Sequence, residues 1–345
     1  MLLTILASVF VFGLLVLFHE LGHFLMAKLT GMRVDEFAIG FGPTLCRYQY
    51  GETVYSIRAI PLGGFNDIAG MDPADNDAGE RGYCAKPLRQ RLLVIVAGPL
   101  MNFLLPVVIF FGLYLAVGVT SPSDRPELGD ILPDKPAAAA GLRKGDVVTR
   151  MNGQATESWN DIVRIILDGG TNPIKVEFRR DGEDRQATLI PVYDQATKRP
   201  LVGIMSSVDT RQPGVGEAAF LALRKTGIVI YKMIAGLWSM ITGEAAAEFA
   251  GPLGVAQMAG EVAQIGFAAL MNFAALLSLN LGIINLLPVP ALDGGHVMTL
   301  LLEGLRGKPL GAKALQYTQM AGVTLLIMLM LFATKNDIVR IFFGN

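Results

Sequence analysis

Three residues at the end of the first apolar stretch have the types and spacing of a metal-binding hydrolase site. They are His19, Glu20 and His23 in the segment HELGH. Residues four apart on a helix lie on the same face, so His19 and His23 can bind one ion. Glu20 lies beside them, where it can serve as general base toward a water on that ion. This pattern is typical of zinc hydrolases, in which zinc lowers the pKa of its water to about 7.

A catalytic zinc site holds three protein ligands and leaves the fourth position open, so a third ligand is required. Asp293 and His296, both in the segment LDGGH, are the candidates. Pro288 and Pro290 precede them and interrupt an apolar stretch, because proline lacks a backbone donor and kinks a helix. A buried aspartate beside this break needs a charged partner, and a zinc ion would be one. The residues alone leave both candidates open.

The composition places these residues in a membrane protein. Of the 345 residues, 52% are hydrophobic and 17% are charged, whereas about 25% are charged in soluble domains. The formal net charge of −1 argues against a nucleic-acid-binding function, which needs concentrated positive charge. A membrane-spanning helix needs about 20 apolar residues. Four stretches near or above that length carry no charged residue, namely 1–18, 92–123, 262–292 and 314–334.

The fold class follows from these stretches. The second and third are longer than one crossing and contain prolines, so we expect loops or broken helix within them. Residues 227–242 are a weaker apolar segment, for which we expect a helix at the membrane surface, with a fifth span as the alternative. We predict an α-helical polytopic membrane protein with about four transmembrane helices. The predicted divisions of the chain are 1–123, 124–208, 209–261 and 262–345.

An inserted soluble domain separates the second span from the surface helix. The chain has 29 basic and 30 acidic residues, and 25 of these 59 lie between Asp124 and Arg199. We expect an α+β domain with a helix over 158–167. Two strands, 174–178 and 187–192, should flank the turn Arg180-Asp181-Gly182.

The distribution of basic residues gives an orientation. Lys28, Arg33, Arg47 and Arg58 follow the first span, and more basic residues precede the second. The positive-inside rule then places 30–91 in the cytoplasm and both the N-terminus and 124–199 outside. Cysteines 46 and 84 would lie in a reducing compartment and stay free thiols.

Several segments together carry a family resemblance. HELGH and NLLPVPALDGG (285–295) match the paired zinc motifs of the site-2 protease family, and AGPLMNF (97–103) matches the start of its second span. FGP (41–43) and RAIPLGGF (58–65) match its membrane-associated β region. The chain thus resembles the intramembrane zinc metalloproteases of that family, close to the bacterial members that regulate the sigma-E response.

The resemblance implies a site and a cellular location. It makes Asp293 the third zinc ligand beside His19 and His23, and it leaves His296 as a neighbour. It implies one zinc ion per chain, with Glu20 as the general base of a metalloendopeptidase in the bacterial inner membrane. The implied substrates are single-pass membrane proteins already trimmed by another protease, such as anti-sigma factors, or leftover signal peptides.

The insert resembles a PDZ domain in LGDIL (128–132), PAAAAGL (136–142), KGDVV (144–148) and MNG (151–153). Members of the sigma-E type usually carry two such domains in tandem, whereas this chain has room for one. A peptide ligand can add as a strand to a sheet edge beside a helix, here 158–167. A steric filter is the other role we consider, and the domain would act on the periplasmic, extracytoplasmic side.

A transmembrane substrate hides its amides in its own hydrogen bonds, so it must unwind before cleavage. The freed amides need partners, and a strand over 55–60, ended by residues 61–64, would offer a sheet edge. Asn285 can hydrogen-bond the substrate backbone or orient the attacking water. The candidate substrate-binding residues are therefore Arg58, Ile60, Gly63, Gly64 and Asn285.

Three other functions compete with proteolysis. An inactive homologue would act as a membrane adaptor through its PDZ domain, but the intact Glu20 and ligand set argue against it. A metal transporter needs ionisable residues on several spans, and the second and fourth charge-free stretches have none. A metalloenzyme acting on a lipid or small molecule fits less well with a peptide-binding insert.

Overall fold

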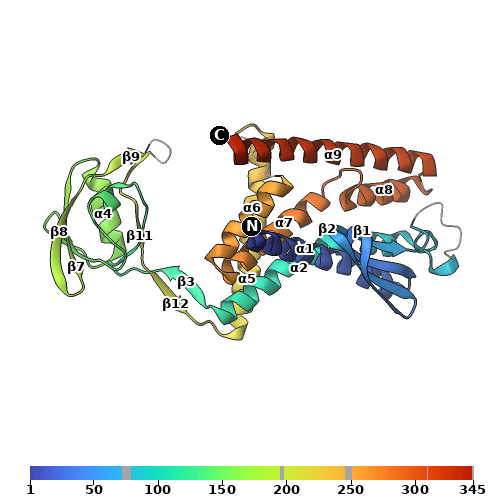
Figure 1. Cartoon of the computed structure of the whole chain (residues 1–345), viewed down its shortest axis with the longest axis horizontal. Helices are drawn as coiled ribbons and strands as arrows, with labels where there is room; N and C mark the ends of the chain where they lie inside the picture. The colour runs from blue at the N-terminus through green and yellow to red at the C-terminus, as the bar shows by residue number, and fades with distance from the viewer. Residues whose placement is uncertain (72–78, 195–197, 245–250, 309, 344–345) are drawn as a thin grey trace. The chain divides into compact units, whose positions relative to one another are not determined.

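The chain forms two units in the computed structural model, which describes residues 1–71, 79–194, 198–244, 251–308 and 310–343. One unit comprises residues 1–116 and 214–345, and it is called the membrane unit below. The other comprises residues 117–213 and is called the inserted unit. Figure 1 shows both units and labels many of their helices and strands.

Within the described residues, four helices are long and apolar enough to cross a membrane. This confirms the predicted number of spans and, with the β region and the α+β insert, the predicted fold class. The spans are α1 (Leu2–Leu29), α2 (Leu88–Ala116), α7 (Phe267–Asn285) and residues 313–340 of α9 (Ala312–Phe343). The remaining helices of the membrane unit are α5 (Val215–Ile241), α6 (Pro252–Ile265), α8 (Asp293–Arg306) and the short 3-10 turns η1 (Gly79–Arg81) and η2 (Tyr83–Ala85).

The apolar stretch 262–292 is broken as predicted, because α6 ends at Ile265 and α7 ends at Asn285. The prediction for 92–123 is wrong in part, since α2 continues through Pro99 and Pro106. Pro106 lacks the N–H that would bond to the carbonyl of Asn102 four residues earlier. The Ser278 hydroxyl of α7 donates to that carbonyl instead, at 2.8 Å. A neighbouring helix thus satisfies the acceptor that the proline frees, as membrane interiors require.

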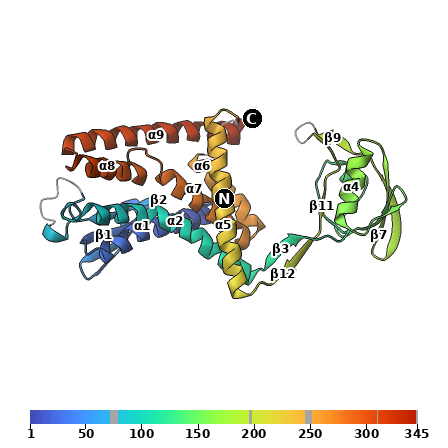
Figure 2. The same cartoon turned by 180° about the vertical axis from the view of Figure 1, so that it is seen from behind.

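Helices α1, α2 and α7 pack on one another, and α6 packs on α1 and α7 (Figures 1 and 2). The contact between α1 and α2 is close because it is made through glycine. A Cβ atom built on Gly22 would overlap the carbonyl of Ala97, and one built on Gly98 would overlap the ring of His23. Small residues of this kind let helix backbones approach in a membrane, where no hydrophobic effect drives association.

The β region consists of two long strands, β1 (Val34–Tyr50) and β2 (Thr53–Ile68). Residues 36–39 of β1 lie between two stretches of β2, with 64–67 on one side and 54–57 on the other. Residues 54–57 pair on their far side with 46–49 of β1. Four stretches therefore lie side by side, with 46–50 and 64–68 on the outside. The prediction that 61–64 ends the strand is wrong, because β2 passes Pro61 at a shift of register and continues on the other side of β1.

Helix α9 is attached to the rest of the unit by a buried carboxylate. Asp337 is 2% exposed. Its Oδ1 accepts from the Gly251 N–H at 3.1 Å and its Oδ2 from the Gly254 N–H at 2.8 Å. The N-terminus of α6 begins with Gly251 and Pro252 and has no capping side chain of its own. Asp337 thus serves as the N-cap acceptor of α6 from a distant helix.

Within its described residues, 117–194 and 198–213, the inserted unit has a four-stranded sheet in the order β6-β5-β7-β8 and three two-stranded sheets, β4 with β11, β3 with β12 and β9 with β10. Helices α3 and α4 complete it, and its core holds buried side chains from α4 and from β4, β5, β7 and β8. The bounds are β3 Val119–Pro122, β4 Leu128–Ile131, α3 Pro136–Ala139, β5 Val147–Met151, β6 Gln154–Ala155, α4 Trp159–Gly169, β7 Ile174–Arg180, β8 Glu183–Leu189, β9 Val192–Asp194, β10 Arg199–Leu201, β11 Ile204–Ser206 and β12 Val208–Arg211.

Local signals place these elements. Ser158 caps α4 in a capping box with Asp161, close to the predicted helix start. The predicted turn at 180–182 is also confirmed, because Asp181 (φ 53°) and Gly182 (φ 85°) both have positive φ, which two-residue hairpins favour. The strands differ in extent from the prediction, since β7 reaches Arg180 and β8 begins at Glu183. The four predicted divisions of the chain stay a proposal beside the two observed units.

Replacing Asp337 should loosen α9 from α6. In Asp337→Ala, two buried N–H groups lose their acceptor, and we expect a loss of about 1–3 kcal/mol of stability. A thermal melt of the detergent-solubilised protein measures this. Arg340→Ala is the matched control, since Arg340 lies 3.5 Å from the same carboxylate and is half-exposed. Equal melting temperatures for Asp337→Ala and wild type would contradict the anchoring role.

Candidate metal centre

Two helices bring the three predicted ligands together. The Nε2 atoms of His19 and His23 are 3.2 Å apart on α1. Asp293, the first residue of α8, places Oδ2 at 3.3 Å from the His19 Nε2 and Oδ1 at 3.5 Å from the His23 Nε2. All three side chains are largely buried. Within the described part of the chain, these are the residues whose ligand atoms converge on one point.

The donor set fits zinc. In a tetrahedral site with bonds of about 2.0–2.2 Å, ligand atoms lie about 3.3–3.6 Å from one another. The two histidine nitrogens are 3.2 Å apart, and each has one Asp293 oxygen at a similar distance, Oδ2 at 3.3 Å from His19 and Oδ1 at 3.5 Å from His23. Taken one ligand atom per residue, the three lie within 4.8 Å of one another, so a bound ion needs only a small adjustment of the carboxylate. The Asp293 Oδ2 atom is buried and has no hydrogen-bond partner, which a bound cation would supply.

The orientation of His23 is determined by the backbone of α2. Its Nδ1 lies 2.8 Å from the carbonyl oxygen of Val94. A carbonyl can only accept, so Nδ1 carries the proton and the Nε2 lone pair faces the site. Gly98 leaves room for this ring. The Ala97-Gly98-Pro99 segment therefore helps to position the ligand His23. This role explains why the segment is one of the motifs matched in the sequence.

Asn102 of α2 orients the ring of His19. The two side chains meet at 3.1 Å between Asn102 Nδ2 and His19 Nδ1, and Asn102 is completely buried. When His19 binds a metal through Nε2, its Nδ1 carries the proton and needs an acceptor. The amide of Asn102 provides one by turning its Oδ1 toward His19, and that oxygen otherwise has no partner.

The segment between α7 and α8 sets the position of Asp293. Ala291 adopts a left-handed conformation (φ 72°), and the backbone turns sharply before the helix begins. A Cβ atom on Gly294 would overlap the carbonyl of Leu287, so the first turn of α8 packs directly on this segment. A carboxylate at the first turn of a helix is also stabilised by the helix dipole. His296, the other candidate from the residues alone, lies in α8 but is not part of the ligand group.

Glu20 follows His19 on α1 and is buried. Its Oε2 accepts from Asn66 Nδ2 at 2.7 Å, and its backbone carbonyl accepts from the same nitrogen at 2.9 Å. Asn66 belongs to the last stretch of β2. The β region thus reaches the proposed general base directly.

The predicted substrate-binding residues of the β region fall into two groups. Gly64 lies against α1, since a Cβ atom there would be 2.8 Å from Glu20 Cγ. Ile60 is exposed, and Gly63 packs against the ring of Phe41. Residues 54–57 have strand partners on both sides, so the predicted free edge over 55–60 is wrong for its first half.

Arg58 is held within the β region. Its Nη2 donates to Glu36 Oε1 at 2.8 Å, and its guanidinium lies 4.7 Å from the centre of the Phe65 ring. Partial burial tends to raise the pKa of the Glu36 carboxyl, but hydrogen bonds from Arg58 and Ser56 outweigh it and hold that pKa below its usual range. The ion pair therefore braces the strands. Asn285 lies half-buried at the end of α7.

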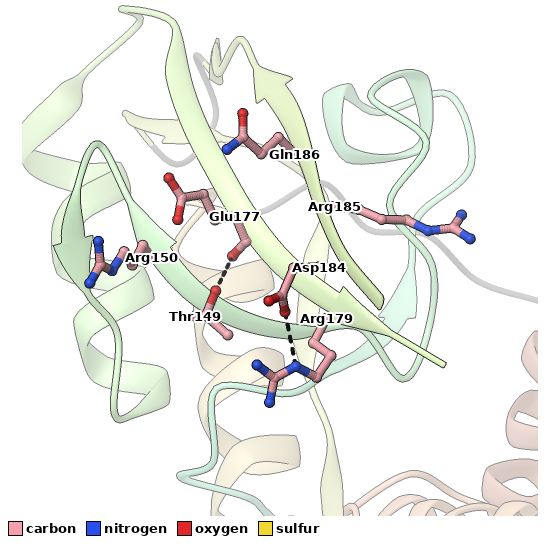
Figure 3. Close-up of a pocket in the computed structure, with 7 residues that line it drawn as sticks. All are labelled: Thr149, Arg150, Glu177, Arg179, Asp184, Arg185 and Gln186. Atoms are coloured by element: carbon pink, nitrogen blue, oxygen red, sulfur yellow. Dashed lines mark hydrogen bonds and ion pairs between the residues drawn. The ribbon is translucent and has the colours of Figure 1, made fainter. Parts of the chain in front are cut away.

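The inserted unit has a polar pocket on its four-stranded sheet, shown in Figure 3. Arg179 Nε donates to Asp184 Oδ1 at 2.9 Å across the hairpin, and Thr149 Oγ1 donates to the Glu177 carbonyl at 3.1 Å. These contacts are between neighbouring strands, and the charged partners are exposed. We interpret the pocket as a solvated sheet surface.

Comparison with known proteins agrees with this geometry. A family model described as Peptidase family M50 matches residues 7–329. The chain belongs to this family of peptidases. Zinc metalloprotease RasP of Geobacillus kaustophilus is 33% identical, with 98% of each chain covered. Regulator of sigma-W protease RasP of Bacillus subtilis is 32% identical, with 98% of this chain and 99% of that protein covered.

The predicted family, metalloprotease class and zinc cofactor are therefore confirmed. Among solved structures, the PDZ domain of an SdrC-like protein from Listeria innocua matches with 20% identity and a TM-score of 0.23. That match covers 26% of this chain and all of that domain. The PDZ domain of an SdrC-like protein from Listeria monocytogenes matches with 24% identity and a TM-score of 0.22, over 25% of this chain and 90% of that one.

Two residues next to the site were not identified from the sequence. Asn102 lies inside the matched segment AGPLMNF, where a polar residue in a charge-free span is a signal in itself. Asn66 directly follows RAIPLGGF, one residue beyond the matched segment. No spacing rule connects it to HELGH, because the contact depends on how β2 folds back onto α1.

The metal content of variants separates the two candidates for the third ligand. Wild type should bind about one zinc ion per chain, because three ligands form one tetrahedral site. Asp293→Ala should lose zinc on dialysis against a weak chelator, whereas His296→Ala should retain it. Elemental analysis of the dialysed proteins gives the answer. Zinc loss in His296→Ala alone would assign the ligand role to His296.

Proposed function

We propose that this protein cleaves transmembrane segments of single-pass membrane proteins, with zinc held by His19, His23 and Asp293 and with Glu20 as general base. The observation that carries this proposal is the convergence of the three ligands from α1 and α8, whose ligand atoms lie within 4.8 Å of one another. Glu20 lies on the same helix turn, in a helix apolar enough to span a membrane.

The chemistry divides between the cofactor and the chain. Zinc, when bound, supplies a Lewis acid that activates water and polarises the scissile carbonyl. Glu20 accepts a proton from the attacking water and later donates it to the leaving amine. The Val94 carbonyl holds His23 with Nδ1 protonated. Asn102, with its Oδ1 turned toward His19, holds that ring in the same way, so that both Nε2 lone pairs remain available. No covalent nucleophile is required.

The β region is our candidate for binding the unwound substrate. An extended segment needs partners for its free amides, and a sheet edge provides them. The stretch 64–68 is an outer one in the β region, and its Gly64 lies against Glu20. We propose that substrate lies along this stretch, with Ile60, Gly63 and Gly64 near it, and that Asn285 at the end of α7 also contacts the substrate backbone or orients the attacking water. Arg58 contributes by bracing the strands.

We propose that the inserted unit acts as a PDZ domain on the extracytoplasmic side. Strand β11 pairs with β4 on one edge in the described part of this unit. The other edge of β11 is where we expect a peptide strand to add. Steric filtering of untrimmed substrates is the second candidate role of this unit. Anti-sigma factors and leftover signal peptides are the substrate classes that we propose.

The orientation can be measured by thiol labelling in intact cells. Cys46 and Cys84 are free and exposed, and we place both in the cytoplasm. In a Cys46→Ser, Cys84→Ser background, a cysteine introduced for exposed Asp181 should react with a membrane-impermeant maleimide. Wild type, carrying only its native cysteines, should not react until the membrane is opened. The opposite pattern would reverse the proposed topology.

Glu20→Gln tests the catalytic proposal. This change keeps the size of the side chain but removes the base, so cleavage should fall by about 10²–10⁴-fold. Zinc content should stay at the wild-type value because Glu20 is not a ligand. The measurement follows a reporter fusion with one transmembrane segment that wild type cuts in a chelator-sensitive reaction. The variant should also co-purify with uncut reporter.

The adaptor function predicts a different result. An adaptor would bind the reporter equally well with glutamate or glutamine at position 20, and neither protein would cut it. Undiminished cleavage by Glu20→Gln, with contaminating protease excluded, would remove Glu20 from the mechanism.

A further inference from the structure

A contact between the β region and Glu20 has no part in holding the metal. Asn66 Nδ2 lies 2.7 Å from Glu20 Oε2 and 2.9 Å from the Glu20 carbonyl oxygen. Its own Oδ1 is buried and has no protein partner. One nitrogen therefore bridges the side chain and the backbone of the same residue.

The chemistry of the two acceptors fixes which end of the amide faces Glu20. A carbonyl oxygen and an ionised carboxylate can only accept hydrogen bonds. Turning the amide over would place Oδ1 against both and would lose two hydrogen bonds, one of them to a charged group. Such charge-assisted bonds are shorter and stronger than those between neutral groups. Asn66 thus holds Oε2 in place and leaves Oε1 to take the proton.

Strand β2 approaches α1 closely at Gly64, which brings Asn66 within hydrogen-bonding distance of Glu20. Alternate residues of a strand face the same side, so Gly64 and Asn66 both face α1 while Phe65 faces away. A Cβ atom on Gly64 would be 2.8 Å from Glu20 Cγ and 3.0 Å from Val16 Cγ1, closer than real side chains pack. Only glycine permits this approach. On the other face, Arg58 stacks on Phe65.

We propose that Asn66 is a positioning residue for catalysis, which holds the carboxylate of Glu20 in its productive orientation and couples that orientation to the β region. This inference rests on the proposed function, in which Glu20 is the general base. Because the donor belongs to the strand along which we place the substrate, a shift of that strand moves the general base with it.

A purely structural role is the alternative, in which Asn66 only ties β2 to α1. Thr53→Val is the matched control for that role. Thr53 is buried in the same strand and donates to the Val34 carbonyl at 2.7 Å, without contact to Glu20. If hydrogen bonds in the β region matter only for folding, Asn66→Leu and Thr53→Val should behave alike.

The experiment measures kcat, KM, zinc content and melting temperature for wild type, Asn66→Leu, Asn66→Asp and Thr53→Val on the chelator-sensitive reporter. Misplacement of a catalytic group by about 1 Å costs on the order of 10²-fold. We expect kcat to fall about 10–100-fold in Asn66→Leu, with KM and zinc content unchanged. Asn66→Asp has nearly the same shape but places a second carboxylate against Glu20, so its kcat should fall at least as far. Thr53→Val should keep the wild-type kcat.

The outcomes separate this inference from the proposed function. If wild type shows no chelator-sensitive cleavage of any single-span reporter, both are overturned. If wild type cleaves and the two Asn66 variants keep its kcat, only the positioning role is overturned. A rise in KM at constant kcat would make Asn66 a substrate contact instead. Loss of zinc from Asn66→Asp and Asn66→Leu would likewise contradict the assignment, since Asn66 touches no ligand.

Discussion

The close crossing of α1 and α2 is the contact on which the metal centre depends. Gly22 lies against the Ala97 carbonyl and Gly98 lies against the His23 ring, so no side chain separates the two helices. At any larger distance, the Val94 carbonyl and the Asn102 amide would not reach the two histidines. The same two glycines thus allow the helices to associate and allow α2 to set the ring orientation of both ligands.

The other elements are joined around this crossing by hydrogen bonds between polar groups on different elements. Ser278 of α7 satisfies the carbonyl that Pro106 leaves without a helical donor. Asp337 of α9 caps α6, and Asn66 of β2 reaches Glu20. Each contact joins residues far apart in the sequence. Where water is excluded, every unmatched polar group costs free energy, so these pairs also specify which elements pack together.

Much of the site and fold could be predicted from the sequence because it depends on local pattern. The i, i+4 spacing of His19 and His23, the uncharged spans and the turn at Asp181 and Gly182 are all determined by neighbours in the chain. The path of β2 could not be predicted in this way. Alternation tells which face a strand residue occupies, but it does not tell which strand lies beside it. The contact of Asn66 with Glu20 was missed for that reason.

The continuous α2 shows a second limit of local reasoning. A proline in a helix removes one donor, and from the sequence alone it predicts a break. Here α2 continues because the Ser278 hydroxyl, 172 positions beyond Pro106 (278 − 106), donates to the carbonyl that the proline leaves free. Sequence spacing does not reveal a contact between residues so far apart. Asp293 is the intermediate case. Its residue type and the prolines before it suggested a ligand, but the choice over His296 needed either a family motif or the geometry of α8.

The wide separation of the ligands along the chain has a consequence for biosynthesis. His19 and Asp293 are 274 positions apart (293 − 19), and the aspartate comes from α8, almost the last helix to be made. A nascent chain that has inserted only α1 and α2 has two histidines and no third ligand, so it is not yet a competent hydrolase. Bringing two such distant positions together also costs chain entropy, which the packing of the intervening elements must offset. The three ligands thus come together only after α8 has been made, so metal binding by the full ligand set is a late step in assembly.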